Sequence, residues 1–223
     1  MSTTWVIVVA AGRGARFAAD QQGGAPTKTY ARLRGARLVD RAVAAAVEAG
    51  DGVVLVLAPG AAWDGATVDA VVAGGATRSD SVRAGLAAVP ADADVVIVHD
   101  AARPLASRAL FDAVTAAVRA GADAAVPGVP VVDTVKQVDG VRVLATLPRA
   151  DLVAVQTPQA FRASVLRDAH REASDASDDA ALVEARGGTV VVVPGDEANR
   201  KITTAADLTV ADALLGASEE GRS

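Results

Sequence analysis

The stretch VIVVAAGRGAR, residues 6–16, decides the fold class of this protein. A continuous run of β-branched residues predicts a strand that is buried on both faces, and the glycines directly after it predict a tight turn from strand to helix. Backbone N–H groups in such a turn, together with the positive end of the following helix, bind phosphate groups. The opening residues therefore predict an α/β protein with a phosphate-binding loop after its first strand.

Two well-known phosphate loops do not fit this stretch. Phe17 stands where a dinucleotide-binding fingerprint needs its third glycine, and the Gly-Lys-Ser/Thr ending of a P-loop does not follow. The remaining interpretation is a glycine loop that carries Arg16, a cation suited to a triphosphate. A tight turn without a ligand would show the same glycines, so the loop alone identifies no activity.

The rest of the chain repeats the alternation of strand and helix. Valine-rich and alanine-rich runs predict strands at 6–10, 53–58, 95–98, 124–129 and 189–193, and helices at 38–49, 79–89, 107–120, 162–173 and 205–215. This order favours a mostly parallel sheet with helices on both faces, in a Rossmann-like fold. We expect one domain over residues 1–223, with a frayed polar tail at 216–223.

One segment interrupts the alternation. Residues 134–146, TVKQVDGVRVLAT, contain two strand-like runs on either side of Asp139-Gly140. This pattern predicts a β-hairpin, within an arm that covers about 133–153. A two-stranded hairpin is marginal alone in water, so it packs either on its own domain or on a second subunit. Its insertion into a regular α/β pattern favours an arm that holds a homodimer together.

Composition excludes several classes of function. The chain has no cysteine, which rules out disulfides, thiolate nucleophiles and cysteine-bound metals. Its net charge of −5 over 223 residues leaves no basic surplus for a nucleic-acid partner. No apolar run reaches the length of a membrane span, and no signal peptide is evident at the start. We therefore expect a cytoplasmic protein that binds small molecules.

Two polar residues, His99 and Asp100, follow the predicted strand 95–98. Open α/β sheets bind their ligands at the carboxyl ends of the strands, which is where these residues fall. Asp100 can bind hydroxyl groups there or help to hold a metal; its alternative role is to cap the next helix. A histidine in this place is more often structural than catalytic.

A glycine pair opens the segment GGATRSDSV, residues 74–82. Serine and threonine beside it are candidate caps for the helix that follows. Gly75 permits the close approach of a base or ribose, and Arg78 and Ser81 lie on one side of the first helical turn. A plain capped helix is the alternative interpretation.

Lysine is rare in this arginine-rich chain. Lys28, Lys136 and Lys201 are the three lysines among 22 basic residues. A lysine retained among so many arginines indicates a site that needs a compact point charge, although three could also remain by chance. Lys28 ends the polar segment 18–27, which has the length of a lid, and Lys201 lies between a strand and a helix.

The ordered motifs AAGxGxR, GGxxRxxSV, HDAARP, DTVK, QTPQ and NxKIT, with Lys28, resemble those of the 2-C-methyl-D-erythritol 4-phosphate cytidylyltransferase family. The resemblance covers about 6–215, and HDAARP at 99–104 is its most specific part. It implies transfer of CMP from CTP to a sugar-alcohol phosphate in the non-mevalonate isoprenoid pathway, with release of pyrophosphate. It also implies a homodimer that uses Mg²⁺, held mainly by the CTP phosphates.

The resemblance further implies three groups of site residues. Catalytic roles fall to Arg16, Lys28, Arg149 and Lys201. Nucleotide binding falls to Ala10, Ala11, Gly12, Gly14, Gly75, Arg78, Ser81 and Ala101. Substrate binding falls to Asp100, Arg103, Thr134 and Thr157, and no side chain is expected to ligate a metal. Arg103, Thr134, Arg149 and Thr157 are expected to reach the substrate phosphate from the side of the other subunit, by way of the hairpin arm.

Alternatives remain at this point. The sister family of ribitol 5-phosphate cytidylyltransferases has similar motifs, although Ala102 favours the erythritol enzymes. A sugar-1-phosphate nucleotidyltransferase and a non-catalytic nucleotide-binding module are the other candidates. The chain departs from the family pattern at Arg13, at Pro26-Thr27 and at Ser177, none of which removes a charge that the chemistry needs.

Overall fold

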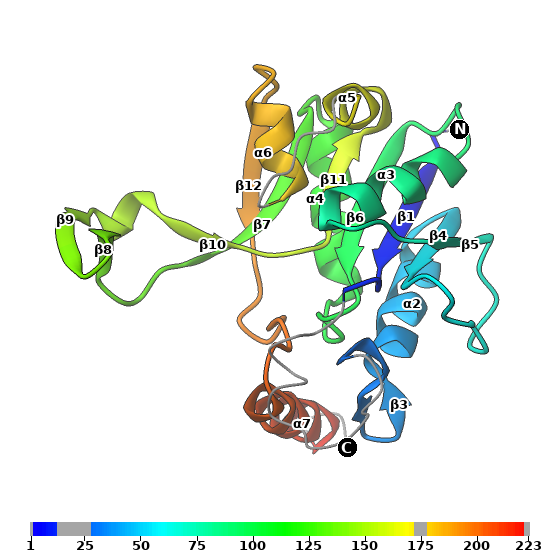
Figure 1. The fold of residues 1–223 in the computed structure, drawn as a ribbon, viewed down its shortest axis with the longest axis horizontal. Helices are drawn as coiled ribbons and strands as arrows, with labels where there is room; N and C mark the ends of the chain where they lie inside the picture. Colours follow the sequence, from blue (N-terminus) through cyan, green and yellow to red (C-terminus); the bar gives the residue numbers. More distant parts are fainter. Residues whose placement is uncertain (1, 13–27, 172–177, 221–223) are drawn as a thin grey trace.

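The centre of the molecule is an eight-stranded sheet (Figure 1). The computed structural model describes residues 2–12, 28–171 and 178–220. Across the sheet the strands run β12 (Val190–Pro194), β7 (Ala124–Pro130), β10 (Val153–Val155) with β11 (Gln159–Arg162), β6 (Val95–Asp100), β1 (Thr4–Val9), β4 (Gly52–Leu57) and β5 (Ala70–Ala73).

Most of this sheet is parallel, as the sequence predicts. β1 lies between β4 and β6 and pairs in parallel with both, so that Val9 aligns with Val56 on one side and with Asp100 on the other. β5 extends the parallel part beyond β4, and β12 pairs in parallel with β7. The carboxyl ends of β1, β4 and β6 therefore meet at one edge, which is where a ligand is expected.

The antiparallel strands β10 and β11 were not predicted. They follow one another along the same side of β7, with β11 opposite Ala124 and Ala125 and β10 opposite Gly128, Val129 and Pro130. Both are short, three and four residues, so neither has a periodicity that sequence could reveal. Their pairing with β7 and β6 closes the sheet between its two parallel parts.

Helices cover both faces of the sheet, and alternate residues of β1 separate two cores. Val6 and Val8 pack with α2 (Leu38–Ala49) and α4 (Arg108–Arg119). Ile7 packs with α3 (Arg78–Ala88), α5 (Ala163–Ala169) and α6 (Asp179–Glu184) on the other face. A smaller cluster of Leu33, Leu38, Ile202 and Ala211 joins α7 (Ala205–Glu220) to the hairpin of β2 (Arg32–Leu33) and β3 (Ala36–Arg37).

The predicted helices are present with changes at their ends. α7 continues to Glu220 instead of ending at Leu215, so residues 216–220 of the tail that was predicted to fray are helical. α2 has the predicted bounds, while α5 ends at Ala169, four residues early, with His170 as its C-cap. α6 was missed, although Asp178 caps it by accepting a hydrogen bond from the Ala181 N–H at 3.0 Å. Within the described residues, no helix is long and apolar enough to cross a membrane.

The predicted hairpin is formed by β8 (Val135–Asp139) and β9 (Arg142–Leu147), which pair with each other. It projects away from the body of the molecule (Figure 1). Its turn is Gly140-Val141, one residue later than predicted, because Asp139 still pairs with Arg142. Gly140 adopts a positive φ of 54°, which a tight hairpin turn requires. Val138, Val143 and Leu144 are more than half exposed on this arm.

Candidate active site

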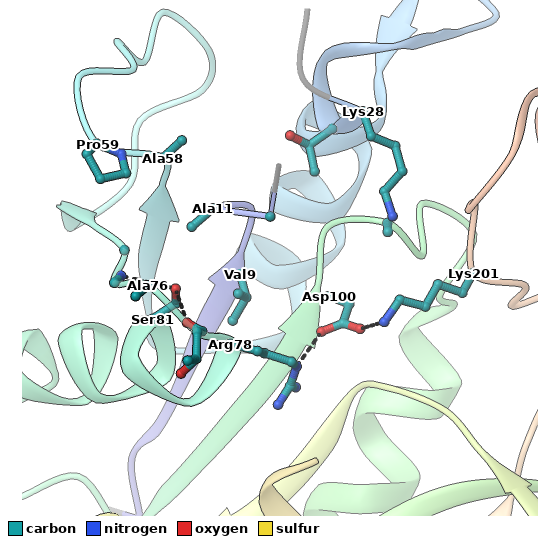
Figure 2. Close-up of a pocket in the computed structure, with 16 residues that line it drawn as sticks. Val9, Ala11, Lys28, Ala58, Pro59, Ala76, Arg78, Ser81, Asp100 and Lys201 are labelled. Carbon is teal, nitrogen blue, oxygen red and sulfur yellow. Dashed lines mark hydrogen bonds and ion pairs between the residues drawn. The ribbon is translucent and has the colours of Figure 1, made fainter. Parts of the chain in front are cut away.

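A cavity of about 440 Å³ opens at the edge where β1, β4 and β6 end (Figure 2). Its apolar side includes Val9, Ala58, Pro59 and Ala76, and its polar side includes Lys28, Arg78, Asp100 and Lys201. The remaining lining residues are Ala11, Gly12, Thr29, Gly74, Gly75, Thr77, Ser81 and Ala102. A pocket of this volume, apolar on one side and cationic on the other, suits a nucleotide with its phosphates.

The turn between β5 and α3 forms one wall of this cavity. A Cβ on Gly74 would lie 2.4 Å from the Ala11 Cβ and 2.7 Å from the Ser81 Oγ, so only glycine lets the two walls approach this closely. The Ser81 hydroxyl accepts a hydrogen bond from the Gly75 N–H at 3.2 Å and donates one to the Thr77 carbonyl at 3.0 Å. Ser81 thus fixes the shape of the wall that the nucleotide would contact.

The same turn starts α3 with a complete capping box. The Thr77 side chain accepts a hydrogen bond from the Asp80 N–H at 3.1 Å, and the Asp80 carboxylate accepts one from the Thr77 N–H at 3.0 Å. The predicted threonine cap is therefore present. This cap places Arg78, the first residue of α3, at the mouth of the cavity (Figure 2).

Asp100 is the charged centre of the site. Its carboxylate accepts a hydrogen bond from Arg78 Nε at 3.2 Å and another from Lys201 Nζ at 2.6 Å (Figure 2). Burial by itself raises the pKa of Asp100, but the charges of Arg78 and Lys201 outweigh it and hold this pKa well below its usual value. Asp100 is therefore an ionised carboxylate at neutral pH, and it orients two cations.

A second cavity of about 170 Å³ adjoins the first. Arg78, Asp100 and Lys201 line both cavities, so this trio forms the boundary between them. The other lining residues of the second cavity are Arg103, Val155, Gln156, Thr157, Gln159 and Asp178. Two neighbouring cavities with a shared charged wall could hold two reactants side by side.

Arg103 lines the second cavity and is bonded to two other segments of the chain. Its guanidinium donates to the Asn199 carbonyl at 2.8 Å and to the Val155 carbonyl at 3.3 Å. Burial lowers the pKa of Arg103, and the nearby charge of Asp100 only partly offsets that effect. The arginine remains cationic, because its ordinary pKa lies far above neutral pH.

His99 has a structural role, as the sequence indicates. It is fully buried, its ring lies 5.2 Å from the Phe111 ring, and its Nδ1 lies 3.2 Å from the Thr157 Oγ1. Burial lowers the pKa of His99 to about 4, against a smaller raising effect of Asp100. The Thr157 Oγ1 also accepts a hydrogen bond from the Asp100 N–H at 3.0 Å, so this pair of side chains fixes the end of β6.

The structure brings most of the predicted site residues together. Eight of them line the first cavity, namely Ala11, Gly12, Lys28, Gly75, Arg78, Ser81, Asp100 and Lys201, and Arg103 and Thr157 line the second. Ala10 and Ala101 are buried and line neither of the two cavities. Their N–H groups donate hydrogen bonds to the Val56 and Val9 carbonyls. Gly14 and Arg16 fall outside the described residues.

Thr134 and Arg149 line neither of the two cavities of their own chain. They lie at the two ends of the hairpin arm, and Arg149 donates a hydrogen bond to the Val132 carbonyl across its base.

Sequence reasoning missed the acidic residues that support the site from the far side. Asp179 accepts a hydrogen bond from Arg78 Nη1 at 2.7 Å and is fully buried, and Asp178 and Gln159 line the second cavity. The signal was the Asp178-Asp179 pair before an apolar run, which is a helix start. Nothing in that local pattern indicates that Asp179 reaches across to α3.

The family model for 2-C-methyl-D-erythritol 4-phosphate cytidylyltransferase matches residues 4–217. The chain belongs to this family. A cytidylyltransferase of that name from Frankia casuarinae is 48% identical, over 94% of this chain and 80% of the relative. A bifunctional IspD/IspF enzyme from Clavibacter michiganensis is 47% identical over 94% of this chain.

Solved cytidylyltransferases share the fold. The enzyme of this family from Thermus thermophilus has a TM-score of 0.78 at 35% identity and covers 96% of this chain and 99% of its own. The one from Francisella tularensis has a TM-score of 0.80 at 28% identity and covers 95% and 99%. The chain spans about half the length of the bifunctional relatives, 54% for Clavibacter and 55% for Solidesulfovibrio magneticus.

Proposed function

We propose that the larger cavity binds CTP, that the smaller cavity binds 2-C-methyl-D-erythritol 4-phosphate, and that CMP passes from the first to the second. The products are 4-diphosphocytidyl-2-C-methyl-D-erythritol and pyrophosphate. The observation that carries this proposal is the shared wall of Arg78, Asp100 and Lys201, which places two cationic side chains where a donor and an acceptor phosphate would meet.

The reaction needs charge neutralisation and alignment more than proton transfer. An oxygen of the acceptor phosphate attacks the α-phosphorus of CTP, and the bond from that phosphorus to the bridging oxygen of the β-phosphate breaks. Both reactants are anions, so cations at the meeting point lower the barrier. The attacking oxygen is already ionised at neutral pH, so the mechanism uses no general base and gives His99 no catalytic role.

On the nucleotide side, the loop after β1 would hold the triphosphate through the backbone of Ala11, Gly12 and Gly14. Lys28 at the cavity rim and Arg16 would stabilise the charge that develops on the α-phosphate. The base and ribose would lie against the turn of Gly75 and Ser81. Backbone groups of that turn would distinguish cytosine from uracil by the donors and acceptors on the base edge.

On the acceptor side, Asp100 would accept hydrogen bonds from substrate hydroxyls, and Lys201 would bind the substrate phosphate. Arg103 and Thr157 line the same cavity and would add donors to that phosphate. Thr134 and Arg149 would come from the arm of a second subunit, since they line neither cavity of their own chain. The proposed active unit is thus a homodimer.

A divalent cation, Mg²⁺, would be held mainly by the CTP phosphates. The residues described fit this arrangement, because Asp100 is the one carboxylate among them that lines the larger cavity. Mg²⁺ commonly binds through one or two carboxylates, phosphate oxygens and water. When bound, the ion would neutralise charge on the triphosphate. We place the reaction in the cytoplasm, since both substrates are charged small molecules.

The deciding experiment measures pyrophosphate release with CTP and Mg²⁺, comparing methylerythritol 4-phosphate with ribitol 5-phosphate. Turnover with the erythritol substrate alone supports the proposal. Turnover with the ribitol substrate would retain the cytidylyl chemistry but contradict the proposed acceptor. CTP binding without release of pyrophosphate from either mixture would contradict a catalytic role for the site.

A further inference from the structure

A fully buried carboxylate lies behind the site, at the start of α6. Asp179 has no exposed surface and lines neither of the two cavities. One oxygen accepts a hydrogen bond from Arg78 Nη1 at 2.7 Å, and the other lies 3.0 Å from His170 Nε2. A buried charge is costly unless it is paired, so this carboxylate requires both partners.

Arg78 is therefore held at two points. Asp100 fixes its Nε from the side of the cavities, and Asp179 fixes its Nη1 from the core side. The opposing charges of these two carboxylates outweigh the effect of burial and raise the pKa of Arg78. Among the described residues, no hydrogen-bond partner is found for the remaining nitrogen, Nη2. This is the donor that the guanidinium can offer to a ligand at the boundary of the two cavities.

His170 determines how Asp179 is oriented. An ionised carboxylate only accepts hydrogen bonds, so the ring must carry its proton on Nε2 to bond Asp179. The other nitrogen, Nδ1, is buried and has no partner within the described part of the chain. His170 therefore acts as a fixed donor that holds the carboxylate toward Arg78.

We infer that Asp179 and His170 are positioning residues for the reaction: they hold the guanidinium of Arg78 at the boundary where CTP and the acceptor phosphate meet. This inference rests on the proposed function. The pair touches neither substrate and acts through Arg78. Two helices from the distal half of the chain, α5 and α6, thereby set the position of a side chain on α3.

The alternative is that the pair only stabilises the packing of α6 on the rest of the fold. A purely structural contact would change stability without changing how bound substrates react. If the pair positions Arg78, its loss should lower kcat instead, because a displaced guanidinium at the boundary of the two cavities no longer aligns the reacting phosphates. The ratio of the effects on kcat and on CTP affinity separates the two roles.

Four variants test the inference by steady-state kinetics, calorimetric CTP binding and thermal melting. Asp179→Asn removes the charge and keeps the shape. His170→Leu removes the donor, whereas His170→Gln keeps an N–H near the position of Nε2. Asp51→Asn is the control for an Asp-to-Asn change away from the site, because the exposed Asp51 also accepts a hydrogen bond, from the Thr4 N–H at 2.7 Å, but lies just before β4, at the opposite edge of the sheet.

The expected result is a fall in kcat of tenfold or more for Asp179→Asn and His170→Leu, with the Kd of CTP changed by less than threefold. His170→Gln should recover most of the kcat that His170→Leu loses, and Asp51→Asn should alter melting alone. A kcat within twofold of the wild type in folded Asp179→Asn and His170→Leu overturns the inference. So does a rise in Kd without a change in kcat.

A direct readout of Arg78 covers the case in which the variants fold poorly. The Nε–Hε resonance of Arg78, assigned through Arg78→Lys, should be sharp in the wild type and shifted or broadened in His170→Leu but not in His170→Gln. An unchanged resonance in His170→Leu contradicts positioning. If the wild type itself does not turn over CTP, the proposed function fails, whereas this resonance still reports on the contact.

Discussion

The Nζ of Lys201 lies 2.6 Å from the Oδ2 of Asp100, which joins a cation and a carboxylate 101 residues apart in the sequence. The Lys201 side chain remains 40% exposed, whereas that of Asp100 is only 10% exposed. The carboxylate is thus fixed in the wall while the ammonium faces solvent. A lysine held this way is already in position to bind an incoming phosphate.

The first prediction follows from this contact. Lys201→Met keeps the aliphatic stem and removes the charge, so we expect kcat/KM for the acceptor to fall by about 10²-fold, as for the loss of a cation that stabilises the transition state. Stability should fall as well, because the buried Asp100 carboxylate loses one of the two cations that compensate its charge. Arg108→Met is the control, since it breaks the exposed ion pair with Asp112 at 2.8 Å on α4. Activity of Lys201→Met within threefold of the wild type would remove Lys201 from the mechanism.

The second prediction concerns the two cations assigned to the α-phosphate. Lys28 lines the larger cavity, and Arg16 follows the glycine loop. We expect Lys28→Ala and Arg16→Ala each to lower kcat by about 10²-fold or more, since each removes charge that matters most as the phosphorus is attacked. Single-turnover kinetics with saturating CTP would measure the chemical step. A near wild-type rate in either variant would refute the role of that residue.

The third prediction is a pH dependence of stability that comes from His99. Burial lowers the pKa of His99 to about 4 in the folded protein, against an ordinary value of 6.5. Between these values the unfolded chain binds the extra proton, so stability is fully present above pH 6.5 and is lost as the pH falls toward 4. The expected loss from this one group is about 2 kcal/mol between about pH 7 and about pH 4.5.

Urea unfolding of the wild type and of His99→Asn at several pH values measures that contribution. Asparagine keeps a polar group near the Thr157 hydroxyl but does not titrate. The variant is expected to be less stable at every pH, because it loses the contact with Phe111. Its free energy of unfolding should nevertheless fall less steeply with acid than that of the wild type. Equal slopes would show that His99 does not titrate on unfolding in this range.

The fourth prediction concerns the arm. Val143 and Leu144 on β9 are 54% and 53% exposed. We expect the protein to be a dimer by light scattering at micromolar concentration, and Val143→Asp with Leu144→Asp to produce monomers, because buried charges would oppose the contact. Activity should fall when dimerisation is lost, since Thr134 and Arg149 then do not reach the acceptor substrate in a neighbouring subunit.

The control for the arm is Val192→Asp, which adds charge at an equally exposed valine of β12, 54% exposed, outside the hairpin. That variant should remain dimeric. A fully active monomer, in the wild type or in the arm variant, would contradict both the arm contact and the role of Arg149 in a neighbouring site.

The sequence by itself determined the parallel part of this fold and the edge of the sheet at which the site lies. Valine runs fixed the strands, alanine-rich amphipathic runs fixed helices such as Leu38–Ala49, and Gly140 fixed the hairpin turn to within one residue. The position of Asp100 at the end of β6 was also local information, because a residue that follows a buried strand must lie at the edge of the sheet.

Only the tertiary structure decided the rest. The short strands β10 and β11 exist because β7 and β6 offer them hydrogen bonds, which no local periodicity records. The bond between Arg78 and Asp179 joins residues 101 positions apart, and each taken alone has the pattern of a helix start. Packing of α3 and α6 on the same face of the sheet brings these charges together and makes Asp179 part of the site, because a buried carboxylate is stable only beside its partners.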